Sequence, residues 1–372
     1  MGRKRAKSLD KRQRIALYQG DNNKIVSKIK SNSVDAVIID PNYGINSKKI
    51  DLEEWLETLL VKDDYVRGGT GFNGNKWDAD LPRLTHFEQL YRDLKPGGFL
   101  ACFASALNEH YVKMTIESVG FKIKEPIMWI RTNGTFARTR NTGGGADNLR
   151  ILNEPIIIAQ KPLNEKNKKS KKYQISKNKS PLGGPAGNLV YEEVADVIKS
   201  LGVAQNSGYK LPPFIIEQKP VNEKEYGLDL VNENARRRTV ISKNIISGAN
   251  KHDTVKPISL IRYLVRLLTK ENAIVLDTFM GSGTCALACL LENRRFIGVE
   301  LENDYFNISK VRTHTIYHRL IFQENKKVSL DELRWHLDGL MFIKQVAKEL
   351  KTSSEKMNLI EQMIGAVKKK IK

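Results

Sequence analysis

The chain has 372 residues, and its 40% hydrophobic content is enough for one large domain or two ordinary domains with a buried core. Lysine and arginine outnumber aspartate and glutamate by 62 to 42, which gives a formal net charge of +20. This charge favours a polyanion such as nucleic acid as the main large partner, although a basic surface that serves only solubility would have the same composition. The three cysteines have no paired ligand spacing, and no apolar run is long enough to cross a membrane. The sequence thus argues against a disulfide framework, a metal site and a membrane span, and indicates a cytoplasmic protein.

The first predicted elements alternate between strand and helix. "VDAVIID" at 34–40 is a short apolar run between turn residues, as in a fully buried parallel strand, and it ends on Asp40. A helix is predicted over 85–94, with "KPGG" at 95–98 as its stop, and then a strand over 99–105. Ligands of open α/β sheets bind beyond the carboxyl ends of the strands, so Asp40 is a candidate site residue.

Two further strands are predicted at 121–131 and 154–162, close enough in sequence to pair. Beyond them the regular pattern is lost until about residue 249. Residues 161–180 hold eight lysines against one glutamate, and Arg236 to Arg238 follow after several Gly/Pro clusters. We interpret this region as a small irregular module that binds phosphates, with a poorly ordered insert as the alternative.

The second half contains a predicted helix over 257–269 and then a βαβ unit. The unit consists of a strand at 273–277, a glycine loop, a helix at about 283–293 and a strand at 296–300, and another helix follows. The loop glycines allow the backbone to turn tightly and to approach a ligand. Glu300 ends the second strand, where an acid suits the diol of a ribose.

The glycine loop fits a dinucleotide poorly. The third glycine of the dinucleotide fingerprint is replaced by Ala286, and Asp277 puts a carboxylate where a pyrophosphate would lie. A carboxylate at that point suits a cationic amine instead. The combination of a ribose and an ammonium group points to S-adenosyl-L-methionine.

Four separate segments carry a resemblance to a known family: "GD" at 20–21, "DPNY" at 40–43, "HDTVKP" at 252–257, and "LDTFMGSGT" with "GVE" between 276 and 300. Their types and order resemble the beta class of DNA amino-methyltransferases, which modify adenine N6 or cytosine N4. "LNEPIIIAQKP" also looks like a stretch of phage and prophage members. The resemblance implies a doubly wound, mostly parallel α/β sheet, which is a permuted Rossmann-like fold with S-adenosyl-L-methionine as cofactor.

The resemblance also implies roles for individual residues. Asp40 and the Pro41 carbonyl would accept hydrogen bonds from the target amino group, and Tyr43 would stack on a base that has been flipped out of the duplex. Asn42 stands where the family usually has a second proline, so we expect a looser turn. Near-normal catalysis, altered base choice and a catalytically weak DNA-binding protein are the three outcomes that this departure leaves open.

The cofactor would be held by ten residues that the family pattern marks. Phe279 would lie near the adenine and Asp21 near its edge, while Glu300 would take the ribose and Asp277 the methionine end. The residues expected at the cofactor are Asp21, Thr254, Lys256, Asp277, Phe279, Gly281, Ser282, Gly283, Thr284 and Glu300.

Adenine N6 is the expected acceptor because the tetrapeptide begins with Asp rather than the Ser common among cytosine-N4 members, and cytosine N4 is the alternative. An RNA or protein methyltransferase is less favoured, because its cofactor loop would normally precede the tetrapeptide. We expect a catalytic half at 1–162, a basic target-recognition region at 163–249, a cofactor half at 250–320 and a helical hairpin at 321–372. Double-stranded DNA is the expected partner, and the resemblance also allows a homodimer and a cognate restriction endonuclease.

Overall fold

The computed structural model describes residues 14–44, 49–67, 69, 79–130, 153–163, 189–191, 226–231, 250, 255–323 and 328–371. The chain forms two compact units. The first unit comprises residues 1–30, 219–265 and 269–372, and the second unit comprises residues 31–218 and 266–268. Most of the predicted basic target-recognition region lies outside the described residues. No helix in the described ranges is long and apolar enough to cross a membrane.

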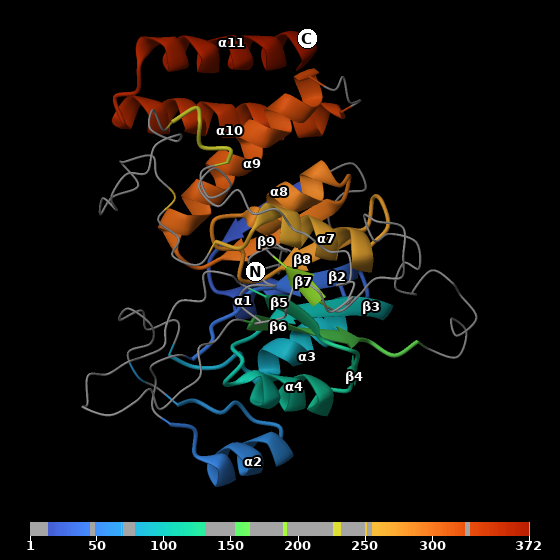
Figure 1. Ribbon diagram of the computed structural model, residues 1–372. Helices are drawn as coiled ribbons and strands as arrows, with labels where there is room; N and C mark the ends of the chain where they lie inside the picture. The colour runs from blue at the N-terminus through green and yellow to red at the C-terminus, as the bar shows by residue number, and fades with distance from the viewer. Residues whose placement is uncertain are drawn as a thin grey trace, which may run out of the picture. The chain divides into compact units, whose positions relative to one another are not determined.

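The second unit is built on a mixed sheet. Its elements are β2 (Val34–Ile39), α2 (Leu52–Leu60), α3 (Leu84–Asp93), β3 (Leu94–Phe103), α4 (Glu109–Ser118), β4 (Lys122–Ile123), β5 (Ile127–Ile130), β6 (Asn153–Gln160) and β7 (Leu189–Tyr191). β2 pairs with β3 in parallel, whereas β6 runs antiparallel to both β3 and β5. The apolar segments from which the strands were predicted are buried in this unit. The helices α3 and α4 lie side by side (Figure 1).

Two elements of the second unit differ from the prediction. The preceding helix ends as predicted, but β3 begins at Leu94 rather than at residue 99 and includes residues 95–98. This early start is possible because Gly98 packs closely on the neighbouring strand. A Cβ on Gly98 would lie 2.9 Å from the Asp35 carbonyl oxygen, so only glycine allows β3 to continue there. The predicted strand at 121–131 is split into β4 and β5 around Pro126, which has no N–H to donate to a sheet.

The first unit contains the predicted βαβ unit. Its elements are β1 (Ile15–Gln19), α1 (Asn22–Val26), α7 (Ile258–Leu268, whose last residues belong to the second unit), β8 (Ile274–Asp277), α8 (Thr284–Leu291), β9 (Arg295–Glu300), α9 (Asn303–Gln323), α10 (Leu330–Glu349) and α11 (Ser354–Ile371). β9 lies between β1 and β8 and pairs with both in parallel. β1 was not predicted from the sequence, because a short, half-polar strand carries little periodic signal.

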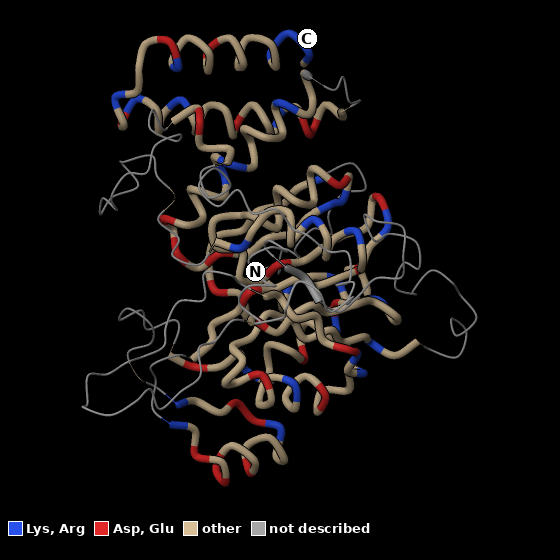
Figure 2. Tube along the Cα trace, viewed as in Figure 1, with Lys and Arg blue, Asp and Glu red and all other residues tan. Residues whose placement is uncertain are grey.

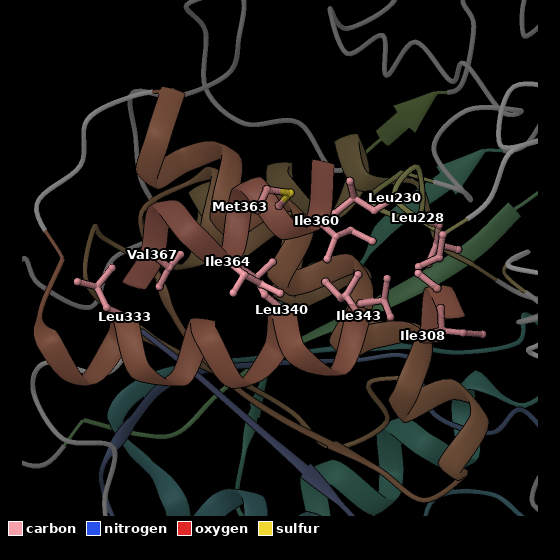
Figure 3. Close-up of a cluster of buried hydrophobic side chains, with 13 residues drawn as sticks. Leu228, Leu230, Ile308, Leu333, Leu340, Ile343, Ile360, Met363, Ile364 and Val367 are labelled. Atoms are coloured by element: carbon pink, nitrogen blue, oxygen red, sulfur yellow. The ribbon is translucent and has the colours of Figure 1, made fainter. Parts of the chain in front are cut away.

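The predicted helical hairpin at the end of the chain is present. α10 and α11 pack along each other, and a capping box between Ser329 and Glu332 begins α10 (Figure 1). Ile343 of α10 and Ile360 of α11 lie in a buried apolar cluster that also includes Leu228 and Ile308 (Figure 3). The last turn of α11 carries three lysines, which appear as the basic end of the helix beside the C-terminus (Figure 2).

A chain of three histidines lies between α9 and α10. His336 is fully buried, and its ring nitrogens lie 3.0 Å from His318 Nδ1 and 3.4 Å from His314 Nδ1. Burial lowers the pKa of His314 to about 3 and that of His318 to about 4, and it also lowers the pKa of His336. The native cluster is therefore neutral at pH 7.

We expect acid to destabilise the first unit through this cluster. Unfolded histidines take up protons when the pH falls below about 6.5, whereas the native ones stay neutral. Each histidine therefore makes the free energy of unfolding fall by about 1.4 kcal/mol for each pH unit below that value. Stability should therefore fall as the pH drops from 6.5 towards 4. Denaturant titrations between pH 7 and pH 5 would measure this slope, which should be smaller in His336→Gln than in the wild type. An equal slope in His336→Gln would contradict the assignment.

Candidate active site

The predicted catalytic turn follows β2 in the second unit. Asp40 lies at the carboxyl end of the strand, and its Oδ1 accepts a hydrogen bond from the Tyr43 hydroxyl at 2.9 Å. The same hydroxyl lies 3.1 Å from Oε2 of Glu154, and Asn108 Nδ2 donates to the Tyr43 carbonyl at 2.9 Å. Burial, together with the negative charges of Asp40 and Glu154, raises the pKa of Tyr43 well above its usual value. The hydroxyl thus keeps its proton, and the turn is fixed at both the side chain and the backbone of Tyr43.

The sequence led us to expect a loose turn at Asn42, but in the structure the Asn42 side chain restrains the turn. Its side-chain amide donates to the carbonyl of Asp80. The Arg67 backbone N–H donates to Asp80 Oδ1 at 2.8 Å, and the Arg67 guanidinium donates to the Gly44 carbonyl at 2.8 Å. The Asn42 amide, which stands in place of the proline ring, therefore ties the turn to Asp80, and Arg67 contacts both Asp80 and Gly44.

We expect Asn42→Pro to lower activity rather than to restore it. The substitution would stiffen the backbone but remove the hydrogen bond to Asp80, which is worth about 1 kcal/mol, and leave a carbonyl without that donor. In a single-turnover assay of the methyl transfer that the resemblance implies, a several-fold loss in the rate constant is the expected result, with unchanged cofactor affinity. Asn108→Ala removes the other amide that holds the turn and should act in the same direction. A more active Asn42→Pro would instead support the idea of a catalytically weak relative.

The glycine loop follows β8 in the first unit. Asp277 ends the strand, and its Oδ1 accepts a hydrogen bond from the Phe279 N–H at 3.0 Å. Gly281 and Gly283 have φ values of 53° and 86°, which favour glycine. A Cβ on Gly283 would lie 2.8 Å from Ser309 Cβ, so the loop could not pack on α9 with a larger residue.

Three acids lie at the carboxyl ends of neighbouring parallel strands of the first unit. Asp277 ends β8, Glu300 ends β9, and Asp21 follows β1 at the start of α1. The Glu300 carboxylate accepts hydrogen bonds from Gly281 N at 2.7 Å and Glu302 N at 2.8 Å. Because β9 lies between β1 and β8, this edge brings together residues that are far apart in the sequence. Burial raises the pKa of Glu300.

Ser282 has protein partners in addition to the role at the cofactor that the resemblance implied. Its carbonyl and hydroxyl accept hydrogen bonds from Arg312 Nη1 at 2.8 and 3.0 Å, and Asn250 Nδ2 also donates to the hydroxyl. The same guanidinium lies 3.4 Å from the Thr284 hydroxyl. Arg312 has no exposed surface, and its hydrogen bonds to Ser282 hold the glycine loop in place. An arginine within a helix gives no sign of burial in the sequence, so this residue was missed.

The structure thus arranges the predicted residues in two groups. Asp40, Pro41, Asn42 and Tyr43 form the predicted catalytic turn of the second unit, where Glu154 and Asn108 also contact Tyr43. The first unit holds the predicted cofactor residues Asp21, Asp277, Phe279, Gly281, Ser282, Gly283, Thr284, Glu300 and the buried Lys256. Thr254 lies outside the described residues.

A glycine loop between parallel strands, acids at the strand ends and a separate Asp-Pro-Asn-Tyr turn are the features on which the resemblance to DNA amino-methyltransferases rested. A family model described as DNA methylase, of the N6/N4 methyltransferase type, matches residues 34–311. The chain therefore belongs to this family of DNA amino-methyltransferases. The predicted enzyme class, the α/β fold and S-adenosyl-L-methionine as cofactor are confirmed by this membership.

Individual relatives agree with the family assignment. The type II methyltransferase M.HindIII of Haemophilus influenzae is 29% identical, across 84% of this chain and 99% of that protein. M2.DpnII of Streptococcus pneumoniae is 24% identical, across 80% of this chain and 89% of its own. The solved cytosine-N4-specific PvuII DNA methyltransferase covers 91% of this chain and 94% of its own with a TM-score of 0.51, but at 15% identity it supports the fold alone. None of these relatives supports the phage-like character that one sequence segment suggested.

Proposed function

We propose that the protein transfers a methyl group from S-adenosyl-L-methionine to the exocyclic nitrogen of a flipped base in double-stranded DNA, with adenine N6 as the acceptor. The observation that carries this proposal is the Asp40 carboxylate at the end of β2, held by the Tyr43 hydroxyl at 2.9 Å. An exocyclic amino group is a weak nucleophile because its lone pair is delocalised into the ring. A fixed carboxylate that accepts a hydrogen bond from one N–H of this amino group stabilises the positive charge that develops on the nitrogen during the reaction.

The remaining residues of the turn would hold the target base in place. The Pro41 carbonyl would accept the second N–H of the amino group, and the Tyr43 ring would stack on the base. Stacking needs a ring in a fixed plane, and hydrogen bonds at the Tyr43 hydroxyl and carbonyl supply this restraint. A base within a duplex cannot reach such a turn, so the proposal includes base flipping.

The glycine loop fits the proposed cofactor. The cofactor supplies a methyl group on a positively charged sulfur. Asp277 would hold its ammonium group, Glu300 its ribose diol and Asp21 the edge of its adenine. The Glu300 oxygens accept backbone N–H groups but keep further lone pairs for ribose hydroxyls. A Cβ on Gly283 would lie 2.8 Å from Ser309 Cβ, so glycine at this position lets the loop pack closely on α9 and keep its turn.

Several finer features remain part of the proposal. Adenine is preferred to cytosine because of the Asp at position 40, and cytosine N4 is the second candidate. DNA recognition would fall to the basic region at 163–249. M.HindIII and M2.DpnII are type II methyltransferases, which makes a cognate restriction endonuclease a reasonable companion, and a homodimer and a cytoplasmic location complete the prediction.

A product assay tests the proposal directly. The protein would be incubated with unmethylated DNA and methyl-labelled S-adenosyl-L-methionine, and the DNA would be digested to nucleosides for mass analysis. We expect N6-methyladenine, whereas N4-methylcytosine would correct the base. A parallel incubation with RNA that labels the RNA, while the DNA stays unlabelled, would assign the activity to RNA. Cofactor binding without any product would favour a binding-only protein.

A further inference from the structure

Glu154 lies beside the catalytic turn although it is 111 positions from Tyr43 in the sequence. Strand pairing explains the approach. Ile39 pairs with Cys102 of β3, and Cys102 pairs with Ile157 of β6. Because β6 runs antiparallel to β3, its first residues lie at the edge where β2 and β3 end. Glu154 is therefore presented to the same edge of the sheet as Asp40.

The Tyr43 hydroxyl lies between two carboxylates, 2.9 Å from Asp40 and 3.1 Å from Glu154. The hydroxyl has one proton and can donate it to one carboxylate at a time. If both carboxylates are ionised, the other contact joins two oxygens without a hydrogen between them. One additional proton on a carboxyl group would satisfy both contacts. The two contacts of the Tyr43 hydroxyl are thus one proton short of two hydrogen bonds.

The proposed reaction releases one proton next to this cluster. The nitrogen lone pair forms the new N–C bond, and the electrons of the methyl–sulfur bond remain on sulfur. One N–H bond of the methylated amino group then breaks, its electron pair returns to nitrogen, and a proton must leave. Asp40 is the carboxylate that faces the amino group in the proposed function.

We propose that Glu154 is a positioning residue that completes a proton acceptor of three groups, Asp40, Tyr43 and Glu154. Asp40 takes the released proton, the Tyr43 hydroxyl then accepts from Asp40 and donates its own proton to Glu154, and the proton is shared along the cluster. Glu154 acts through Tyr43, since the hydroxyl is what links the two carboxylates. This inference rests on the proposed methyl transfer and adds to it a residue from a different strand.

The test compares Glu154→Gln with the wild type under single-turnover conditions over a range of pH. We expect the rate constant of methyl transfer to fall by about 100-fold, as for loss of general acid–base assistance, with cofactor and DNA affinities unchanged. The acid limb of the pH profile should also move to lower pH, because a neutral amide removes one negative charge from the cluster that takes up the proton. A purely structural role would not shift this limb. Glu154→Asp should recover part of the rate.

Two controls keep the result clear. Glu125→Gln changes an exposed glutamate of the same unit and should leave both rate and pH profile unaltered. In a Tyr43→Phe background, Glu154→Gln should add little, because the link between the carboxylates is already lost. A wild-type rate and pH profile in Glu154→Gln, or a full additional loss in the Tyr43→Phe background, would overturn the inference. A wild-type protein without methylated product would instead refute the proposed function. If Glu154→Gln does not fold, the rate constants and pH profiles of Glu154→Asp and Tyr43→Phe replace it in the test. Wild-type values in both variants would overturn the inference.

Discussion

Replacement of Asp40 with asparagine is expected to abolish most methyl transfer, with a loss of about 100- to 1,000-fold in the single-turnover rate constant. Asparagine has nearly the same shape as aspartate, so the β2 turn should persist. Its NH₂ group, however, donates where the reaction needs an acceptor, and its oxygen carries no full charge to favour a developing cation. The contact with the Tyr43 hydroxyl at 2.9 Å would also lose its ionic acceptor. The effect should therefore appear in the chemical step.

The measurement is the rate of label transfer to DNA with enzyme in excess, together with separate titrations of cofactor and DNA. Asp63→Asn is the matched control, because Asp63 is an exposed aspartate of the same unit whose side chain accepts a hydrogen bond from the Asp64 N–H. It should transfer methyl groups at the wild-type rate. Full activity of Asp40→Asn would show that the carboxylate is not the group that assists the amino nitrogen.

The parts of the site that could be predicted from the sequence are those with a strong local signal. The apolar run of β2 ends in a polar turn, so Asp40 could be located at a strand end without any three-dimensional information. The strand, glycine loop, helix and strand from β8 to β9 likewise occupy one continuous segment. In both places the local sequence determines where the functional groups lie, because a strand end fixes the position of the next side chain.

The residues that could not be predicted depend on contacts across the sequence. Glu154 reaches Tyr43 only because β6 is antiparallel to β3, and no local pattern sets that direction. The burial of Arg312 depends on the loop above it, whose Ser282 carbonyl and hydroxyl accept its N–H groups. The turn at Asn42 shows the same limit, since the hydrogen bond from its amide goes to Asp80, 38 positions away. A missing proline was visible in the sequence, but the bond that replaces its restraint was not.

Replacement of Asp277 with asparagine is expected to weaken cofactor binding by about 10- to 100-fold, which corresponds to loss of a charged hydrogen bond of about 1.5 to 3 kcal/mol. Asp277 has two separable roles in the structure and the proposal. It accepts the Phe279 N–H at 3.0 Å, which fixes the loop, and its charge would hold the ammonium group of the cofactor. The amide oxygen of asparagine can still accept from Phe279, so the loop should keep its form while the charge is lost.

Calorimetric titration with S-adenosyl-L-methionine would separate the two roles, with thermal unfolding of the free protein as the check on the loop. Asp304→Asn is the matched control, because Asp304 is an exposed aspartate of the same unit in the first turn of α9. We expect unchanged unfolding in both variants and weaker binding only in Asp277→Asn. Unchanged affinity would mean that the aspartate serves the loop alone, and the ammonium group would then need another acceptor at the strand ends, where Glu300 and Asp21 are the remaining acids.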